Sequence, residues 1–317
     1  MREVLKSYLE YICGKDNVEV DALLSEKTNF KIGGPAKFFV TVPNKAVLLR
    51  LVSALKFIEE DFFIIGGGYN ILAGDYGFDG VVVKLGFSEI LDNGPFLYAD
   101  AGARLGDVLN FAKERTLSGL EFAVGIPGTV GGAVFMNAGA YGGQLSDVLV
   151  CADVLVDGAV VNMNATELRL KYRTSIFQKR KDWIILGAYF YLSSGNHDDI
   201  EAKQNELFQK RLASQPYYEA SAGSTFRRPR PTFYVGTTIR DLGLQGLVIG
   251  GAQISEKHAG FIINKGGATA RDVIKVVNTI KREVYKKFGV RLRLENVRLG
   301  RFTKSLPLHP SKAPAGS

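Results

Sequence analysis

Glycine is concentrated between Gly119 and Gly143, and this stretch constrains the fold more than any other part of the chain. Glycine makes up 36 of the 317 residues, whereas an average protein contains about 7%. The stretch includes the run Gly125-Ile-Pro-Gly-Thr-Val-Gly-Gly-Ala133. So many permissive main-chain positions would weaken a packed core, unless a large group packs against the bare main chain. The stretch therefore favours a ligand-binding surface over a simple turn.

A second glycine loop, Gly66-Gly-Gly-Tyr-Asn70, follows a predicted buried strand at 62–65. Neither loop has the spacing of a dinucleotide fingerprint, G-x-G-x-x-G, and the chain contains no P-loop motif. Both loops nevertheless suit phosphate, because glycine lets main-chain N–H groups approach an anion closely, and residues 128–132 can open a helix. Taken alone, the 66–70 loop favours a tight turn over a phosphate-binding site.

Composition and charge limit the functional class. With 46% hydrophobic and 23% charged residues, the chain is typical of a soluble globular protein of about two domains. The net charge of +8 suits an anionic ligand, but it is spread along the chain, so we expect no nucleic-acid partner. Two cysteines cannot form a disulfide scaffold, which favours a cytoplasmic protein. Charges interrupt the N-terminal segment, so we expect neither a signal peptide nor membrane association.

Hydrophobic periodicity and capping residues predict a mixture of helices and strands. Helices are expected at 1–14, 43–60, 105–116, 196–213 and 269–288, and strands at 36–42, 62–65, 81–84, 96–100, 148–156, 183–191, 224–227, 247–249, 259–264 and 290–299. Thr269 should cap the last helix and Gly289 should end it. The strand, helix, strand order with short connections indicates an α/β or α+β unit.

Sequence blocks at 28–36, 66–72, 119–143, 172–177, 221–226, 255–264 and 288–300 follow one another in a recognisable order. Block 172–177 reads Tyr-Arg-Thr-Ser-Ile-Phe, and block 221–226 reads Ser-Ala-Gly-Ser-Thr-Phe. With these blocks the chain resembles the UDP-N-acetylenolpyruvoylglucosamine reductase family over residues 20–300. Because Leu192 runs directly into the 196–213 helix, the chain is similar to the shorter, type II form of that family.

The resemblance implies an α+β fold. It consists of an FAD-binding domain of the p-cresol methylhydroxylase and vanillyl-alcohol oxidase type, with two α/β subdomains, and a C-terminal α+β substrate-binding domain. On this basis residues 1–20 form an N-terminal helix and 21–195 the FAD-binding domain, with subdomains at 21–90 and 91–195. The substrate-binding domain is 196–303, with its last strand carrying Glu295, and 304–317 is a disordered tail.

The resemblance implies non-covalent FAD and NADPH as the hydride donor, with no metal. The glycine loops contain no histidine or cysteine that could tether the flavin. Where the family's first loop commonly has serine, this chain has Tyr69. The residues implied to contact FAD are Gly66, Gly67, Gly68, Tyr69, Asn70, Ile71, Gly125, Ile126, Pro127, Gly128, Gly131, Gly132, Asn137, Ala138, Gly139 and Tyr141.

Three residues match family positions that act in the reduction of UDP-N-acetylglucosamine enolpyruvate to UDP-N-acetylmuramate, a peptidoglycan precursor. Arg173 would hold the substrate carboxylate and stabilise the enolate, and Ser224 would give a proton to C2. Glu295 would act beside C2, although the glutamate that usually precedes it is Arg293 here. The resemblance further implies Arg227, Lys257 and His258 near the uridine diphosphate, and Tyr172 and Asn264 in the cleft.

Other functions stay open at this point. A different FAD-dependent oxidoreductase of the same fold would not explain why Arg173, Ser224 and Glu295 all fall in matching blocks. A flavin-binding or anion-binding protein without turnover, and a basic nucleic-acid binder, are further alternatives. We expect a cytoplasmic monomer whose partners are small molecules, the enolpyruvyl sugar nucleotide and NADPH.

Overall fold

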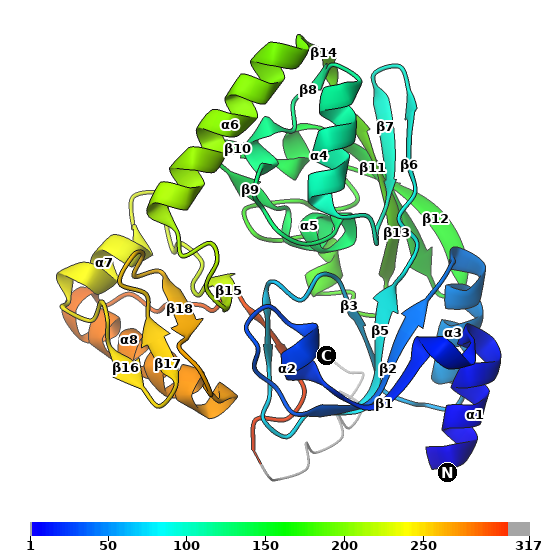
Figure 1. The fold of residues 1–317 in the computed structure, drawn as a ribbon, viewed down its shortest axis with the longest axis horizontal. Coiled ribbons are helices and arrows are strands. Elements are labelled where there is room, and N and C mark those ends of the chain that lie inside the picture. Colours follow the sequence, from blue (N-terminus) through cyan, green and yellow to red (C-terminus); the bar gives the residue numbers. More distant parts are fainter. Residues whose placement is uncertain (1, 304–317) are drawn as a thin grey trace, which may run out of the picture.

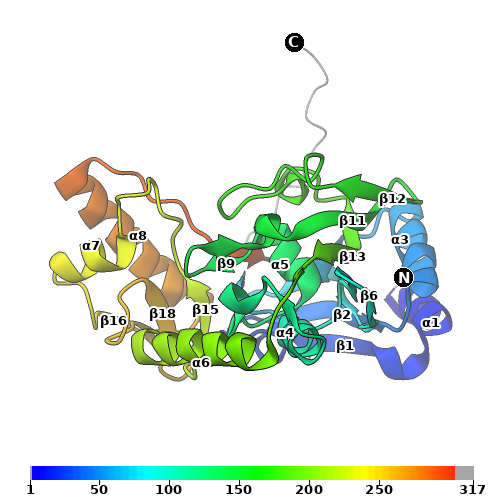
Figure 2. The ribbon, with the colours of Figure 1, turned by 90° about the horizontal axis from the view of Figure 1, so that it is seen from above.

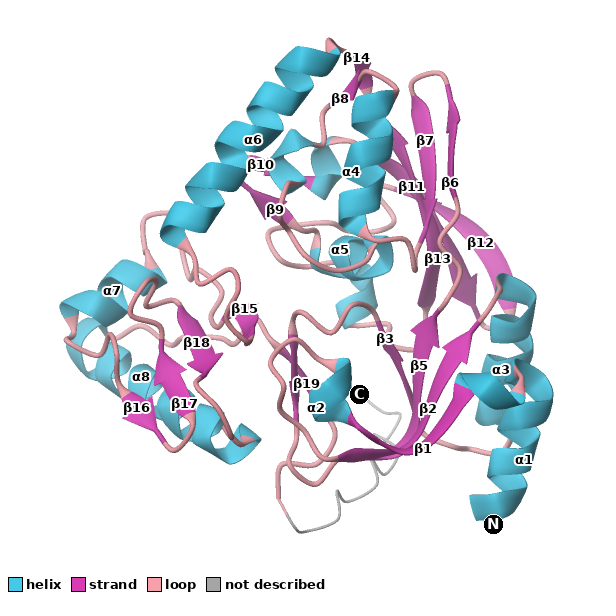
Figure 3. Cartoon of the chain, viewed as in Figure 1, coloured by secondary structure: helices cyan, strands magenta, loops and turns pink. Residues whose placement is uncertain are grey.

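The computed structural model describes residues 2–303, so the predicted tail at 304–317 lies outside the described residues. Figures 1 and 3 show three groups of strands and helices around a common centre. The helices are α1 (Arg2–Cys13), α2 (Leu24–Lys27), α3 (Lys45–Phe57), α4 (Leu105–Glu114), α5 (Val130–Met136), α6 (His197–Ser214), α7 (Val235–Asp241) and α8 (Ala270–Phe288).

The first sheet has the order β1-β2-β5-β3 and is covered on both faces. Its strands are β1 (Val18–Leu23), β2 (Pro35–Val42), β5 (Phe78–Leu85) and β3 (Phe62–Ile65). Phe38, Val40 and Val42 point into the main core, whereas Phe39 belongs to a second cluster. This alternation places apolar side chains on both faces, as parallel strands require. Helix α3 covers the main-core face, and its buried residues recur every three or four positions.

The second sheet is antiparallel, with the order β12-β11-β13-β7-β6. Its strands are β12 (Ala159–Asn164), β11 (Leu149–Val156), β13 (Ile184–Tyr191), β7 (Phe96–Asp100) and β6 (Ile90–Asn93). Helices α4 and α5 lie on one side of it, and its buried residues share one continuous core with the first sheet. Short two-stranded pairs, β9 (Gly139–Ala140) with β10 (Gly143–Gln144) and β8 (Leu117–Ser118) with β14 (Ser193–Ser194), complete this part.

The C-terminal sheet, β15-β18-β17-β16, packs against α7 and α8 around a separate core. Its strands are β15 (Ser221–Ser224), β18 (Phe261–Asn264), β17 (Ala252–Ile254) and β16 (Val248–Ile249). Seen from above, this part stands to one side of the two larger sheets (Figure 2). The strand expected at 224–227 is wrong in position. Strand β15 ends at Ser224, and beyond it Phe226 forms only a single bridge, with Leu294.

The expected final strand at 290–299 is mostly irregular. Only β19 (Val297–Leu299) is extended, and it pairs in parallel with β4 (Ile71–Ala73), beside the first glycine loop. Glu295 lies just before β19, not within a strand of the C-terminal sheet as expected. The reason is that the chain crosses here between two parts: the Glu295 N–H bonds to Thr225 O, whereas the Val297 N–H bonds to Asn70 O.

Helix α6 packs on the part that precedes it. It runs beside α4 (Figure 1), with Lys113 Nζ 2.8 Å from Glu201 Oε1, and Arg211 Nε donates to Val124 O over 3.1 Å. These contacts favour a domain boundary after this helix, near residue 215, over the expected boundary at 195/196, and we propose the later position.

Helix α8 begins and ends where its capping residues predict. The Thr269 side chain accepts from the Asp272 N–H while Asp272 accepts from the Thr269 N–H, and Gly289 closes the helix with φ 65°. Replacing Thr269 with alanine removes a hydroxyl that satisfies a free helix N–H, so we expect a loss of about 1 kcal/mol of unfolding free energy in urea.

Thr238→Ala is the matched control for this prediction. The Thr238 hydroxyl only bonds back to Tyr234 O within α7, an interaction with little effect on stability. Equal losses in the two variants would contradict the capping role.

Candidate active site

A cavity of about 1000 Å³ lies where the three parts of the chain meet. Both glycine loops, the Gly139–Tyr141 segment, β15 and the crossing segment before β19 contribute to its wall. Its polar residues include Arg173, Ser224 and Glu295. The cavity therefore collects residues that lie far apart in the sequence.

The residues expected to contact FAD line this cavity, with the exception of Asn137. Asn137 is buried behind the wall, where its Oδ1 accepts from the Ser146 N–H and its Nδ2 lies 3.2 Å from Lys171 O. Its φ of 42° is the left-handed conformation in which it ends α5. Asn137 thus supports the loops that carry Gly139 and Arg173 and is not itself a lining residue.

The glycine loops leave room for a large group. A Cβ on Gly128 would meet only Tyr69 Cδ2, at 3.9 Å, and a Cβ on Gly132 would meet only Thr129 Oγ1, at 3.6 Å. Gly67 forms no hydrogen bond to any described residue, so its N–H is free for an anionic oxygen. Aromatic and aliphatic residues line the same cavity, among them Phe62, Ile64 and Trp183. Bare main chain plus an apolar wall fits the phosphates and flat rings of FAD.

Tyr69 connects the two glycine loops. Its ring lies against Gly67, where an added Cβ would come within 2.9 Å of ring atom Cδ2. The same atom is the nearest neighbour of a Cβ built on Gly128. The bulky side chain of Tyr69 is therefore part of the cavity wall.

Replacing Gly132 with alanine tests whether the bare main chain matters. The residue lies in α5, where alanine favours the helix, so the FAD-free protein should lose no stability. The new methyl group projects into the cavity, and we expect FAD to bind at least tenfold more weakly in a fluorescence titration. Gly106→Ala in α4, where a Cβ meets nothing within 4 Å, should bind FAD normally. Unchanged FAD affinity in Gly132→Ala would contradict this placement.

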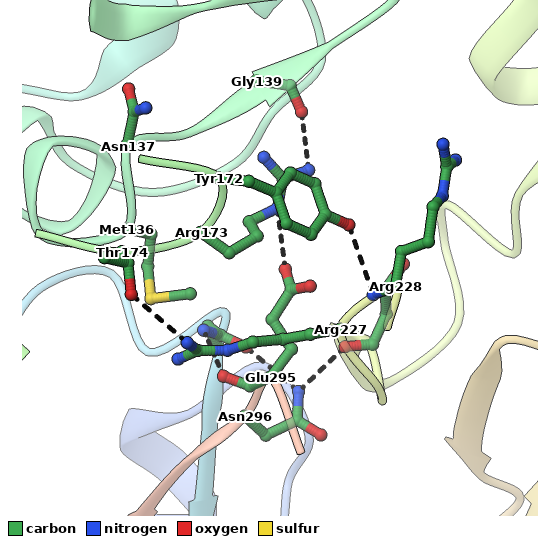
Figure 4. Close-up of polar contacts among 12 residues, drawn as sticks. Met136, Asn137, Gly139, Tyr172, Arg173, Thr174, Arg227, Arg228, Glu295 and Asn296 are labelled. Carbon is green, nitrogen blue, oxygen red and sulfur yellow. Dashed lines mark hydrogen bonds and ion pairs between the residues drawn. The ribbon is translucent and has the colours of Figure 1, made fainter. Parts of the chain in front are cut away.

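Arg173 and Glu295 meet in this cavity (Figure 4). Arg173 Nε lies 3.0 Å from Glu295 Oε1, and Arg173 Nη2 donates to Gly139 O over 2.7 Å. The guanidinium also lies 5.3 Å from the centre of the Tyr172 ring. Arg173 has φ 52°, a conformation that non-glycine residues rarely adopt and that is often found at functional sites.

Burial raises the pKa of Glu295, and the charges of Arg173 and Arg227 partly offset this effect. Its side chain is only 13% exposed. The arrangement keeps a carboxyl group close to a permanent cation with its charged form disfavoured by desolvation. Such a group can stabilise a developing charge or transfer a proton during a reaction.

Ser224 ends β15, where it is exposed and lines the cavity. Its hydroxyl bonds to no described residue, whereas its carbonyl lies 3.4 Å from Asn296 Nδ2. Asn296 also donates to Asn70 Oδ1 and Ala222 O. This asparagine therefore ties β15, the first glycine loop and the Glu295 segment together.

Gln178 is a site residue that sequence reasoning missed. Its Nε2 donates to Arg173 O over 3.0 Å, and its Oε1 accepts from Arg227 Nη2 over 3.0 Å. Arg227 also lies 3.4 Å from Thr174 Oγ1. Gln178 thus links the strained main chain at Arg173 to the second cation near Glu295. The only available signal was its place one residue after the 172–177 block.

The other expected substrate residues are not part of the cavity lining. Lys257 Nζ bonds to Leu212 O, and Asn264 Nδ2 bonds to Phe30 O and Lys31 O. His258 is largely buried, its Nδ1 accepts from the Gly260 N–H, and burial lowers its pKa. These three side chains hold loops together. The structure thus gives no support to contact of Lys257 and His258 with a diphosphate, or to a place for Asn264 in the cavity wall.

Tyr172 and Arg227 lie at the edge of the site. Tyr172 is half-exposed and its hydroxyl lies 3.4 Å from the Arg228 N–H. Cavity residues absent from the sequence-based set include Arg211, Tyr217, Tyr218 and Arg298. No group of three or more His, Cys, Asp or Glu side chains within residues 2–303 could hold a metal ion. No helix in that range is long and apolar enough to cross a membrane.

Residues 36–169 match a family described as an FAD binding domain, and residues 215–299 match one described as UDP-N-acetylenolpyruvoylglucosamine reductase, C-terminal domain. The expected α+β fold, with an FAD-binding domain followed by a C-terminal domain, is confirmed. The second match begins where α6 ends, in agreement with the boundary near residue 215.

Relatives named UDP-N-acetylenolpyruvoylglucosamine reductase match nearly the whole chain. One from Caldanaerobacter subterraneus subsp. tengcongensis is 42% identical over 297 residues, 93% of this chain and 98% of the relative. One from Pseudothermotoga lettingae is 43% identical over 278 residues, 88% of this chain and 96% of the relative. The crystal structure of the reductase from Thermus caldophilus superposes with a TM-score of 0.77 at 32% identity, covering 89% of this chain and 99% of that one. The chain therefore belongs to the UDP-N-acetylenolpyruvoylglucosamine reductase family.

Proposed function

We propose that this chain reduces UDP-N-acetylglucosamine enolpyruvate to UDP-N-acetylmuramate, with FAD bound non-covalently in the cavity and NADPH as the reductant. The observation that carries the proposal is the meeting of Arg173, Glu295 and Ser224 in one cavity with the two glycine loops. When bound, FAD accepts a hydride from NADPH and passes one to the methylene carbon of the enolpyruvyl group.

Arg173 binds the carboxylate of the enolpyruvyl group and stabilises the negative charge that develops beside it. A guanidinium suits this role because it stays protonated and presents a planar pair of donors. Its contacts to Glu295 and Gly139 O orient the group before substrate arrives, so little reorganisation is needed during the reaction.

Ser224 gives its proton to C2 of the substrate. A serine hydroxyl is a weak acid, but the acceptor is a strongly basic carbanion, and the cation Arg173 lines the same cavity. The free hydroxyl of Ser224 supports this role, since no described residue occupies it. Glu295 lines the same cavity, where it holds Arg173 in place and polarises C2.

Supply of the hydride by NADPH, action in the cytoplasm and a monomeric state complete the proposal. The two free cysteines, Cys13 and Cys151, support a reducing compartment. The positively charged cavity residues Lys84, Lys181 and Arg298 support binding of phosphorylated ligands.

An anaerobic titration tests the proposed function directly. Purified protein with FAD should lose its flavin absorbance on addition of NADPH and regain it on addition of the enolpyruvyl sugar nucleotide. Bleaching without recovery would contradict the proposed substrate but support NADPH as the hydride donor. Absence of a flavin spectrum after reconstitution with FAD would contradict the proposal as a whole.

A further inference from the structure

Arg211, in the last turn of α6, reaches the cavity from the side of the second glycine loop. Its side chain is buried, with 6% of the residue exposed, and it forms part of the cavity lining. Nε donates to Val124 O and Nη1 to Gln215 Oε1, each over 3.1 Å. The guanidinium lies 5.3 Å from the centre of the Tyr141 ring. Three groups of the protein thus hold Arg211 in one orientation.

The remaining nitrogen of this guanidinium has no partner. Arg211 Nη2 is buried without a hydrogen bond, and no carboxylate of residues 2–303 pairs with Arg211. A guanidinium stays charged in proteins and offers five N–H donors, and a buried charge without a counter-charge is costly. The folded chain therefore holds a positive charge whose compensation must come from a ligand in the cavity.

Arg211 lies at the reactive end of the cavity. Its side chain packs against the glycine loop, since a Cβ on Gly125 would come within 2.9 Å of Arg211 Cδ. The Tyr141 ring beside its guanidinium follows Gly139 by two residues, and the Gly139 carbonyl accepts from Arg173 Nη2 over 2.7 Å. The unpartnered cation and the Arg173–Glu295 pair thus face the same region.

We propose that Arg211 binds the negative charge that the flavin ring acquires on reduction. A hydride brings two electrons and one proton to a neutral oxidised ring, so the product carries one negative charge, shared between N1 and the C2 carbonyl. A fixed cation beside this part of the ring favours the reduced form and raises its reduction potential. This inference rests on the proposed function, because it requires FAD in the cavity.

The pyrophosphate of FAD is the other negative group that could meet this cation. Within FAD, however, the ribityl chain separates the pyrophosphate from the reactive ring. The contact of Arg211 with Tyr141, two residues from the Gly139 carbonyl that holds Arg173, favours the ring. Measurements on oxidised and reduced FAD separate these two sources, because the pyrophosphate is charged in both states and the ring only in one.

The experiment compares Arg211→Gln with wild type and with Lys210→Gln, which removes one positive charge from the adjacent, exposed residue. Fluorescence titration gives the affinity for oxidised FAD, and spectroelectrochemistry gives the midpoint potential of the bound flavin. For Arg211→Gln we expect the affinity for reduced FAD to fall at least tenfold relative to that for oxidised FAD. For a two-electron couple this lowers the potential by about 30 mV. Lys210→Gln should leave the potential unchanged.

Each other outcome overturns the proposal. A tenfold weaker affinity for oxidised FAD at unchanged potential would assign Arg211 to the pyrophosphate, and no change in either quantity would leave it a purely structural role. If Arg211→Gln does not fold by circular dichroism, Arg211→Lys takes its place. That variant keeps the charge and should hold the ratio of the two affinities within threefold of wild type, and a tenfold fall would refute the proposal. Wild-type protein that binds no FAD would instead refute the proposed function.

Discussion

Replacing Ser224 with alanine should leave reduction of the flavin by NADPH at the wild-type rate and slow reduction of the enolpyruvyl sugar nucleotide about 10²–10⁴-fold, the range typical for loss of a general acid. The two half-reactions differ because only the second needs a proton at C2. The structure favours this split, since Ser224 lines the cavity and its hydroxyl bonds to no other described residue. Stopped-flow absorbance under anaerobic conditions measures both rates.

Ser221→Ala is the matched control for this prediction. Ser221 lies in the same strand and also lines the cavity, but it is buried and its carbonyl, not its hydroxyl, holds Asn29. Both half-reactions should stay near wild type in this variant. If Ser224→Ala slowed the two half-reactions equally, a binding role would replace the proton-donor role.

Replacing Glu295 with glutamine should lower turnover of the sugar nucleotide about 10²–10³-fold, as loss of a single oriented polar group in an active site does. The amide keeps the shape of the side chain but removes the charge that orients Arg173. Steady-state kinetics with the enolpyruvyl substrate measures this loss. A wild-type kcat in this variant would contradict a role for Glu295 in the reaction.

The same substitution should change how stability depends on pH. Burial raises the pKa of Glu295 above its ordinary value of 4.5. At pH values between 4.5 and this raised pKa, the folded protein holds more protons at this site than the unfolded chain does. The contribution of the site to stability therefore falls as pH rises. Glutamine has no proton to lose. The unfolding free energy of Glu295→Gln should therefore rise relative to wild type as pH increases from 4.5.

Urea denaturation at several pH values measures this difference. Glu283→Gln, on the surface of α8 and outside the cavity, controls for the loss of one carboxylate. A difference between Glu295→Gln and wild type that stayed constant, or that moved in favour of wild type with rising pH, would contradict the raised pKa.

Local signals in the sequence were sufficient for some elements of the fold. The helix at 269–288 was predicted within one residue, because Thr269, Gly289 and a regular apolar stripe all indicate the same limits. The helix expected at 43–60 is shorter, Lys45–Phe57, since the Asn44 side chain and not Pro43 caps it. Strands β1, β4, β6, β12 and β17 were missed. Runs of three residues, such as β4 and β17, carry too little periodicity to be recognised.

The site residues also divide into those that sequence blocks reveal and those that only the structure reveals. Arg173, Ser224 and Glu295 were found through motif blocks, and the structure brings the first and third into direct contact. Lys257, His258 and Asn264 lie in blocks as well, yet their side chains bond to loop carbonyls or amides. Arg211 and Gln178 lie outside the blocks, and their importance depends on burial and on partners that no local pattern reveals.

The pairing of β19 with β4 has a consequence for the order in which the protein can form during synthesis. Partners such as Val297 and Ile71 are more than two hundred residues apart, and contacts of this range form slowly because a long loop must close first. Since a ribosome releases the chain from its N-terminus, the glycine loops emerge well before the segment that carries Glu295. The cavity wall is completed only when the segment from Glu295 to Gly300 has been made, so a chain terminated before it would contain the cofactor loops without the segment that closes the site around them.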